Sequence, residues 1–174
     1  MPYLVAAVVL LGVLCLLNLL LTIGILRRMR SRNDHPGPLF TLGPGSPIGS
    51  FSVETTAGEP VSDGTLTGVV GFFSAGCEAC HELLPRFAEH ARGLGRDQVL
   101  AVVGGGDETA IRALSPVARV VAADLGGGPV ALAFQNSWTP ALYLVGDDHK
   151  VVAVGSRMDE LPAWNPRDPV VGTG

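Results

Sequence analysis

The pattern of apolar and polar positions divides the chain into an N-terminal apolar run and a longer part with alternating periodicity. The run covers residues 3–26, carries no charged side chain and is followed by four arginines within residues 27–32. A helix rises about 1.5 Å per residue, so this run is long enough to cross a bilayer with some tilt. We therefore predict a transmembrane anchor over residues 1–26. A cleaved signal peptide fits less well, because it carries basic residues before a shorter apolar core.

Three further regions follow the predicted anchor. Residues 27–44 combine the basic cluster with prolines and glycines that interrupt helices and strands, which indicates a linker. Residues 45–160 are of a size typical of one domain. Residues 161–174 contain further prolines and are predicted to form a loose tail.

Within the predicted domain, strand-like and helix-like patterns alternate. Residues 69–73 are apolar at nearly every position, as expected of a strand that is buried on both faces. The order of the elements predicts an α/β domain with a mixed sheet. In chain order we expect a hairpin at 51–61, strands at 69–73, 99–103 and 119–123 alternating with helices at 78–92, 107–114 and 129–135, and a hairpin of strands 141–145 and 151–154.

Composition and charge narrow the possible functions. The net charge of −4 combines a basic start with a later part that holds 16 acidic and 8 basic residues after residue 32. An acidic domain argues against nucleic-acid binding. Three cysteines are too few for a disulfide-dense scaffold. One of them, Cys15, lies in the predicted anchor and is interpreted as a small apolar residue.

Cys77 and Cys80 are the residues that point most directly to chemistry. They follow the predicted buried strand and open the predicted helix at 78–92. Residues three apart share one helix face, so the two sulfurs can form a disulfide. The positive end of the helix dipole favours a thiolate, which is the nucleophilic form. We expect Cys77 to attack a substrate and Cys80, one turn inside, to be the buried resolving thiol.

Three other uses of the cysteine pair are possible. Structural zinc needs about four ligands, and the sequence has no second CxxC and no HxxxH pair. The pair followed by His81 matches the CxxCH pattern of haem attachment, with Met158 or His149 as a distal ligand. Haem attachment does not suit cysteines that follow a buried strand of an α/β domain. The third possibility is an inert core pair, which does not suit two cysteines at this position. We therefore expect neither a metal nor another cofactor.

The segment from Phe72 to Pro85 resembles the active-site segment of thioredoxin-fold proteins. It is most similar to membrane-tethered thiol-disulfide oxidoreductases of the TlpA/ResA type and to the methylamine-utilisation accessory protein MauD. The loop Ser137-Trp-Thr-Pro140 resembles the Thr-cis-Pro loop of this family, and residues 51–61 resemble its N-terminal hairpin. The resemblance extends over residues 45–156 and implies a thioredoxin-like fold.

The resemblance also implies roles for the residues before the strand at 141–145. Pro140 would have a cis peptide bond and lie beside the two sulfurs. The Thr139 backbone would then pair with an extended substrate segment, as in strand addition. Thr139, Pro140 and the adjacent Trp138 are therefore the candidate substrate-binding residues.

The sequence departs from thioredoxin in the groups around the cysteines. Thioredoxin carries a buried acid six residues before its first cysteine, and this chain has Gly71 there. Glu78 opposes thiolate formation because of its negative charge, whereas His81 favours it. Together with Glu82, these residues are candidates for tuning the reactivity of the pair. The acidic Glu78 favours a reductant over a strong oxidant.

These observations predict a membrane-anchored dithiol–disulfide exchanger that acts on a protein partner and is served by an electron donor or acceptor protein. The alternatives are a dedicated maturation or chaperone-like module of the MauD type and, less favoured, a small membrane-bound c-type cytochrome.

The arginines after the anchor favour a cytoplasmic domain. The resemblance favours an extracytoplasmic one, as does the absence of cysteines other than the CxxC pair after residue 26. We expect the domain outside the cytoplasm.

Overall fold

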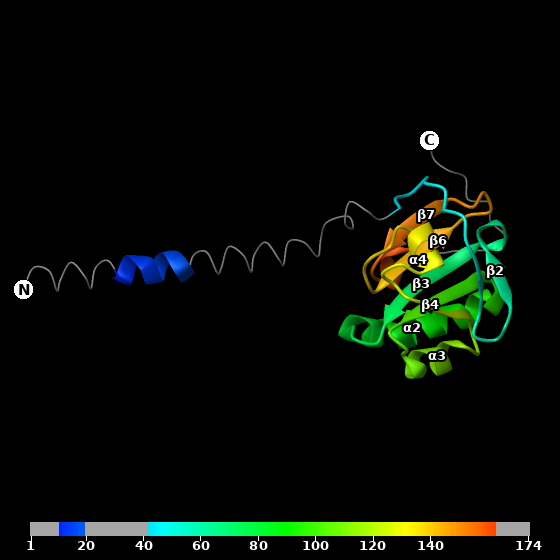
Figure 1. The fold of residues 1–174 in the computed structure, drawn as a ribbon, viewed down its shortest axis with the longest axis horizontal. Helices are drawn as coiled ribbons and strands as arrows, with labels where there is room; N and C mark the ends of the chain where they lie inside the picture. The colour runs from blue at the N-terminus through cyan, green and yellow to red at the C-terminus, as the bar shows by residue number, and fades with distance from the viewer. Residues whose placement is uncertain (1–10, 20–41, 163–174) are drawn as a thin grey trace, which may run out of the picture. The chain divides into compact units, whose positions relative to one another are not determined.

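The computed structural model describes residues 11–19 and 42–162. The chain divides into two units, Met1–Gly37 and Pro38–Gly174, and in the first of them residues 11–19 are helical. No helix among the described residues is long and apolar enough to cross a membrane. The rest of the predicted anchor, the linker up to residue 41 and most of the predicted tail lie outside the described residues (Figure 1).

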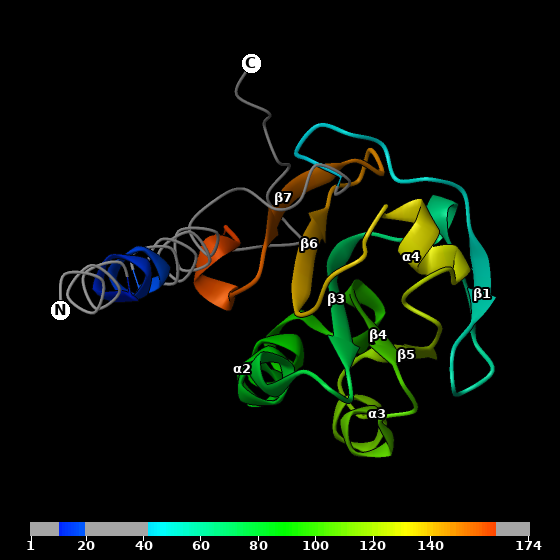
Figure 2. The same cartoon turned by 60° about the vertical axis from the view of Figure 1, so that its left-hand side comes forward.

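The second unit is built on a five-stranded mixed sheet with the order β5-β4-β3-β6-β7 (Figure 2). The central strand β3 is parallel to β4 and antiparallel to β6. The predicted α/β domain with a mixed sheet is confirmed. The strands of this sheet are β3 (Gly68–Ser74), β4 (Val99–Gly104), β5 (Arg119–Ala122), β6 (Ala141–Val145) and β7 (Val151–Gly155).

Both faces of the sheet are covered, and each has its own apolar core. One core lies between the sheet and helices α2 (Glu78–Leu94) and α3 (Glu108–Leu114). The other lies under α4 (Pro129–Ala133) and the antiparallel hairpin of β1 and β2. Alternate residues of β3 supply the two cores, which explains why its sequence is apolar throughout. The remaining elements are β1 (Ser52–Glu54), β2 (Pro60–Ser62) and the short 3₁₀ helices η2 (Asp63–Thr65), η3 (Arg96–Gln98) and η4 (Met158–Glu160).

Side chains at the helix starts explain where the two longer helices begin. The Asp107 carboxylate accepts hydrogen bonds from Thr109 N and Ala110 N at 3.2 and 3.0 Å, which caps α3 as predicted. Cys77 is the N-cap residue of α2. Gly95 ends α2 with φ +97°, a backbone conformation that favours glycine. Helix α2 therefore continues two residues beyond the predicted end.

The domain begins earlier than the predicted boundary at residue 45. Leu42, placed in the linker by its glycine- and proline-rich surroundings, is buried in the core under α4. Next to it, Gly45 N donates to Val151 O at 2.7 Å and Val151 N donates to Ser46 O at 2.9 Å. These bonds pair the incoming chain with β7, the edge strand of the sheet. The pairing satisfies backbone groups that an edge strand otherwise leaves open.

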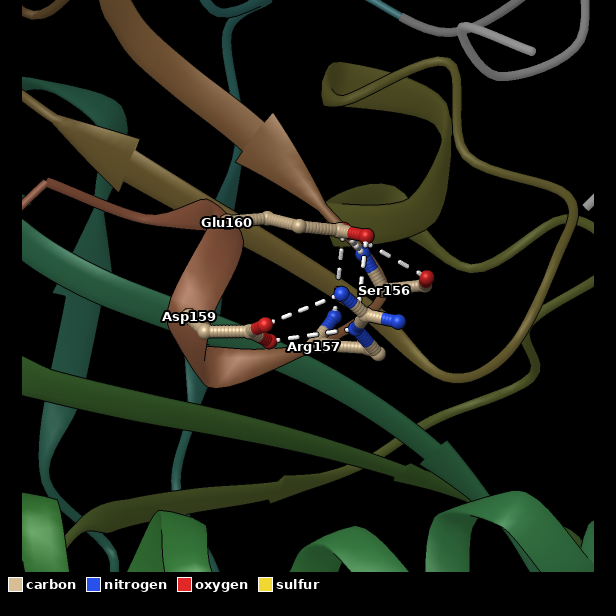
Figure 3. Close-up of polar contacts among 4 residues, drawn as sticks. All are labelled: Ser156, Arg157, Asp159 and Glu160. Atoms are coloured by element: carbon tan, nitrogen blue, oxygen red, sulfur yellow. Dashed lines mark hydrogen bonds and ion pairs between the residues drawn. The ribbon is translucent and has the colours of Figure 1, made fainter. Parts of the chain in front are cut away.

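A polar turn follows β7 and leads into η4 (Figure 3). The Glu160 carboxylate accepts hydrogen bonds from Ser156 N at 2.6 Å and Arg157 N at 3.3 Å. The Arg157 guanidinium pairs with Asp159 at 2.9 Å, and its hydrogen bond is the main cause that lowers the pKa of Asp159 from its ordinary value. The turn brings Met158 into contact with the core between the sheet and α2.

Candidate functional site

The two cysteines lie where the central strand passes into the first long helix. Cys77 precedes α2 as its N-cap, and Cys80 lies in the first turn of this helix. They are joined by a disulfide with a Cα–Cα distance of 5.2 Å. Cys80 is 1% exposed, whereas Cys77 is half-buried. Cys80 N, in the first turn of the helix, donates to Cys77 Sγ at 3.1 Å and also to Cys77 O at 3.1 Å, so one N–H of the helix start is directed at this sulfur.

The turn from Ser74 to Cys77 is held by contacts on several sides. Cys77 N donates to Ser74 O at 3.2 Å and closes the turn. The His81 ring donates from Nε2 to Ala75 O at 3.2 Å. Gly105, in the loop after β4, has φ +71° and lies so close that a Cβ there would be 3.4 Å from the Ala75 Cβ. The position of Cys77 is therefore set by three separate segments of the chain.

The loop before β6 reaches the same end of the sheet. The Thr139–Pro140 peptide bond is cis, which confirms the prediction. The Thr139 hydroxyl lies 3.0 Å from the Ser74 hydroxyl, three residues before Cys77. The structure thus brings together the CxxC turn and the Thr-Pro loop, which are 60 residues apart in the sequence. Their roles in binding a substrate stay predictions.

Trp138 belongs to this loop, and its side chain is half-buried against the core under α4. Its carbonyl accepts a hydrogen bond from Asn136 Nδ2 at 2.9 Å. Asn136 is itself buried, and its Oδ1 accepts from the buried Tyr143 hydroxyl at 3.1 Å. Asn136 and Tyr143 therefore support the loop from inside, a role that sequence reasoning missed.

The three residues predicted to tune the pair all lie in the first turns of α2 and are exposed. Glu78 is the first helical residue, directly after Cys77. His81 contacts the CxxC turn through Ala75 O, and the structure places its ring Nε2 on that carbonyl. Glu82 follows His81 on the exposed side of the helix. Their influence on the sulfurs stays a prediction.

The surroundings of Gly71 show which side chains occupy the space where thioredoxin has its buried acid. A Cβ at Gly71 would lie 2.7 Å from Phe73 Cε2 and 2.9 Å from Phe87 Cε2. These two rings pack edge to face with their centroids 5.0 Å apart, in the same core as Cys80. Phenylalanine rings thus fill the space where a side chain at residue 71 would lie, and the core near Cys80 is apolar at this point.

One of the two residues proposed as a distal haem ligand, His149, lies far from the cysteines. His149 lies in the turn between β6 and β7, where its Nδ1 donates to Leu66 O. In the register of β3 and β6, Val145 is opposite Gly68, so this turn is at the start of β3. Cys77 follows the other end of that strand, about 20 Å away at some 3.3 Å per residue. The position of His149 therefore does not support it as a haem ligand, whereas Met158 packs against the same core as Cys77.

The described part of the chain contains no group of three or more His, Cys, Asp or Glu side chains arranged to hold a metal ion. The cysteines are joined to each other in the structure. Cysteines joined in this way can interconvert between a disulfide and a dithiol.

Comparison with solved structures identifies the fold. A thio-disulfide isomerase from Thermus thermophilus matches with a TM-score of 0.53 and 22% identity, over 67% of this chain and 87% of that one. The thioredoxin domain of a thiol-disulfide oxidoreductase from Bacteroides vulgatus matches with a TM-score of 0.52 and 21% identity, over 70% and 94%. A DsbF homologue from Corynebacterium diphtheriae matches with a TM-score of 0.55 and 16% identity, over 74% and 90%.

The second unit therefore has a thioredoxin-like fold, with a disulfide-bonded CxxC pair at the start of its first long helix. No protein-family model matches the chain, and no curated protein matches it. These similarities establish the fold alone. The chemistry of the site depends on the two cysteines.

Proposed function

We propose that this chain is a thiol-disulfide oxidoreductase that exchanges a dithiol and a disulfide with a protein partner through Cys77 and Cys80. The observation that carries the proposal is the disulfide at the start of α2, with Cys80 buried and Cys77 half-buried. A nucleophilic cysteine needs access to the substrate and a positive environment, and the helix start supplies both. The structures with the same fold described above are named as enzymes of this chemistry.

In the reductive direction, the Cys77 thiolate attacks one sulfur of the partner's disulfide. A mixed disulfide forms between Cys77 and the partner, and the partner's other sulfur leaves as a thiolate that takes up a proton. The Cys80 sulfur, after giving up its proton, then attacks Cys77 Sγ and displaces the second partner thiolate. Two electrons pass to the partner, whose two thiolates take up one proton from Cys80 and one from water, and the chain is left with the Cys77–Cys80 disulfide. A donor protein that carries a dithiol restores the reduced pair by the same two exchanges.

The reductive direction is favoured by the charge near the nucleophile. Glu78 immediately follows Cys77 and is exposed at the helix start. Its negative charge disfavours the Cys77 thiolate. The reduced pair is therefore less stable relative to the disulfide. A pair with this property donates electrons more readily than a strongly oxidising one.

Thr139 and Pro140 form the substrate-binding edge in this proposal, with Trp138 beside them. The contact between the Ser74 and Thr139 hydroxyls supports this, because it ties the loop before β6 to Ser74, which lies three residues before Cys77. An extended segment next to the partner's disulfide would add to this edge by backbone hydrogen bonds. Such binding depends on the backbone and accepts varied side chains.

The proposal also includes a single membrane anchor at residues 1–26 and an extracytoplasmic domain. The apolar run at 3–26 supports the anchor, and the absence of further cysteines after residue 26 suits an oxidising compartment. Intact cells are treated with a mild reductant and then a membrane-impermeant thiol reagent. Labelling of Cys77 before lysis is expected. Labelling only after lysis would place the domain in the cytoplasm.

The exchange itself is tested with the full chain in detergent, in a Cys15→Ala background so that all thiols belong to the pair. The native pair should reduce a disulfide-linked peptide, and Cys77→Ser should abolish the reaction. Cys80→Ser should accumulate a mixed disulfide with the peptide, because the resolving thiol is missing. Preferential alkylation of Cys80 in the reduced protein would contradict the assignment of roles. Peptide binding without any exchange would favour the maturation module of the MauD type.

A further inference from the structure

We infer that Ser74 is a positioning residue that fixes Thr139 against the CxxC turn and thereby sets the edge to which a peptide substrate binds. The inference rests on the proposed function and adds a residue to its substrate site. Ser74 was not a candidate from the sequence, and it contacts neither sulfur through its side chain in the described structure. Its importance comes from the two segments that it joins.

The pairing of β3 with β6 explains why Ser74 and Thr139 meet. In this antiparallel ladder the last pair toward the CxxC turn is Phe72 opposite Ala141. Two residues further along β3 is Ser74, and two residues before Ala141 is Thr139. Directly opposite residues have Cβ atoms about 4.5–5.5 Å apart, which is within reach for two short hydroxyl side chains. The observed distance between Ser74 Oγ and Thr139 Oγ1 is 3.0 Å.

Ser74 also acts on Cys77 through its backbone. Its carbonyl accepts the hydrogen bond from Cys77 N at 3.2 Å that closes the turn before the helix. One residue therefore holds the backbone of the nucleophile with its carbonyl and the residue before Pro140 with its hydroxyl. The pair is partly buried, so the hydroxyl bond is less exposed to competition from water than a surface bond.

This arrangement separates substrate binding from the redox properties of the sulfurs. The hydrogen bond to Cys77 Sγ comes from Cys80 N of α2, and the two sulfurs are bonded to each other. Loss of the Ser74 hydroxyl leaves these contacts and the Ser74 carbonyl in place. We therefore expect a change in the binding of an extended substrate and little change in the dithiol–disulfide equilibrium.

The experiment uses the reduced full chain in the Cys15→Ala background and follows its single-turnover oxidation by a disulfide-linked peptide dimer. Ser74→Ala should raise the half-saturating peptide concentration about fivefold to tenfold, the effect expected for one neutral hydrogen bond, and change the limiting rate less than about twofold. Thr139→Val should act in the same way, and the double variant should be no worse than either single variant.

Two controls separate positioning from a general structural effect. Hydroxyethyl disulfide has no peptide segment, so its rate with Ser74→Ala should stay within about twofold of native, as should the equilibrium of the pair with glutathione. Ser62→Ala removes a comparable hydroxyl contact, 3.3 Å from Thr65 Oγ1 and remote in the hairpin, and should leave peptide binding unchanged.

Several results would overturn the inference. They are an unchanged half-saturating concentration in Ser74→Ala, effects of Ser74→Ala and Thr139→Val that multiply in the double variant, and an equal slowing with hydroxyethyl disulfide. If the reduced native chain reduces neither compound and does not exchange with glutathione, the proposed function fails and the inference fails with it. Exchange by the native chain with an unaffected Ser74→Ala variant removes the inference alone.

Discussion

The glycine at position 71 is the clearest place to test how the core under the reactive pair is packed. We predict that Gly71→Ala destabilises the oxidised protein. The added Cβ would lie 2.7 Å from Phe73 Cε2 and 2.9 Å from Phe87 Cε2, closer than ordinary contact. Both rings are buried, at 0% and 1% exposure, and pack against each other. They can give way only by displacing further core side chains.

The size of the effect follows from two opposing contributions. Overpacking a core by one carbon costs about 1–3 kcal/mol of the free energy of unfolding. Replacing glycine also restricts the unfolded chain, which stabilises the fold by about 0.4–1 kcal/mol. The expected net loss therefore lies between about 0 and 2.6 kcal/mol, with a central value of about 1.3 kcal/mol. Gly71→Asp should lose more, because a carboxylate would enter the same apolar space without a hydrogen-bond partner that the structure supplies.

Urea denaturation of the oxidised full chain, followed by tryptophan fluorescence, measures this loss as a lower midpoint with an unchanged slope. Gly93→Ala is the matched control, since Gly93 is exposed in α2 and a Cβ there would meet nothing within 4 Å. It should stabilise by about 0.5–1 kcal/mol through helix propensity. A midpoint for Gly71→Ala at or above the native one would show that the rings move without cost and would refute the packing explanation.

Substitutions at three further residues test contacts elsewhere in the domain. Asp107→Ala should lower the free energy of unfolding by about 1 kcal/mol in urea denaturation, because α3 loses its cap. Asp107→Asn should keep most of this stability, because asparagine also caps helices. Tyr143→Phe removes the buried hydrogen bond to Asn136 and should cost about 1–3 kcal/mol in the same assay. Arg157→Ala should return the pKa of Asp159 upward toward its ordinary value, as measured by NMR titration of the carboxyl group, and an unchanged pKa would contradict the assigned cause.

The elements that could be predicted from the sequence are those with strong local patterns. The apolar run at 69–73 became β3, and Asp107 caps α3 as expected, because both depend on neighbouring residues in the chain. Leu42 was not assigned to the domain, since its burial depends on a core to which strands more than 60 residues later contribute. Helix α4 ends at Ala133, two residues before the predicted end, and Phe134 then packs into that core.

The same distinction applies to the site. Cys77, Cys80 and the Thr139-Pro140 pair were recognisable because each forms a short contiguous motif. Ser74 was missed because its partner is defined by the register between β3 and β6, and a sequence pattern does not specify that register. One signal was present: Ser74 is the only polar residue in the run of β3 and stands at its end. A hydroxyl there has to find a partner at the rim of the sheet.

The path by which the chain enters the domain bears on how an anchored exchanger would work. Gly45 and Ile48 form backbone hydrogen bonds with Val151 and His149, at the start of β7. Through the pairing of Val151 with Val145 and of Val145 with Gly68, this entry point lies at the start of β3. Cys77 follows the opposite end of the same strand. The entry segment therefore occupies a different end of the sheet from the reactive pair, and a partner can approach Cys77 without displacing residues 45–48 from β7.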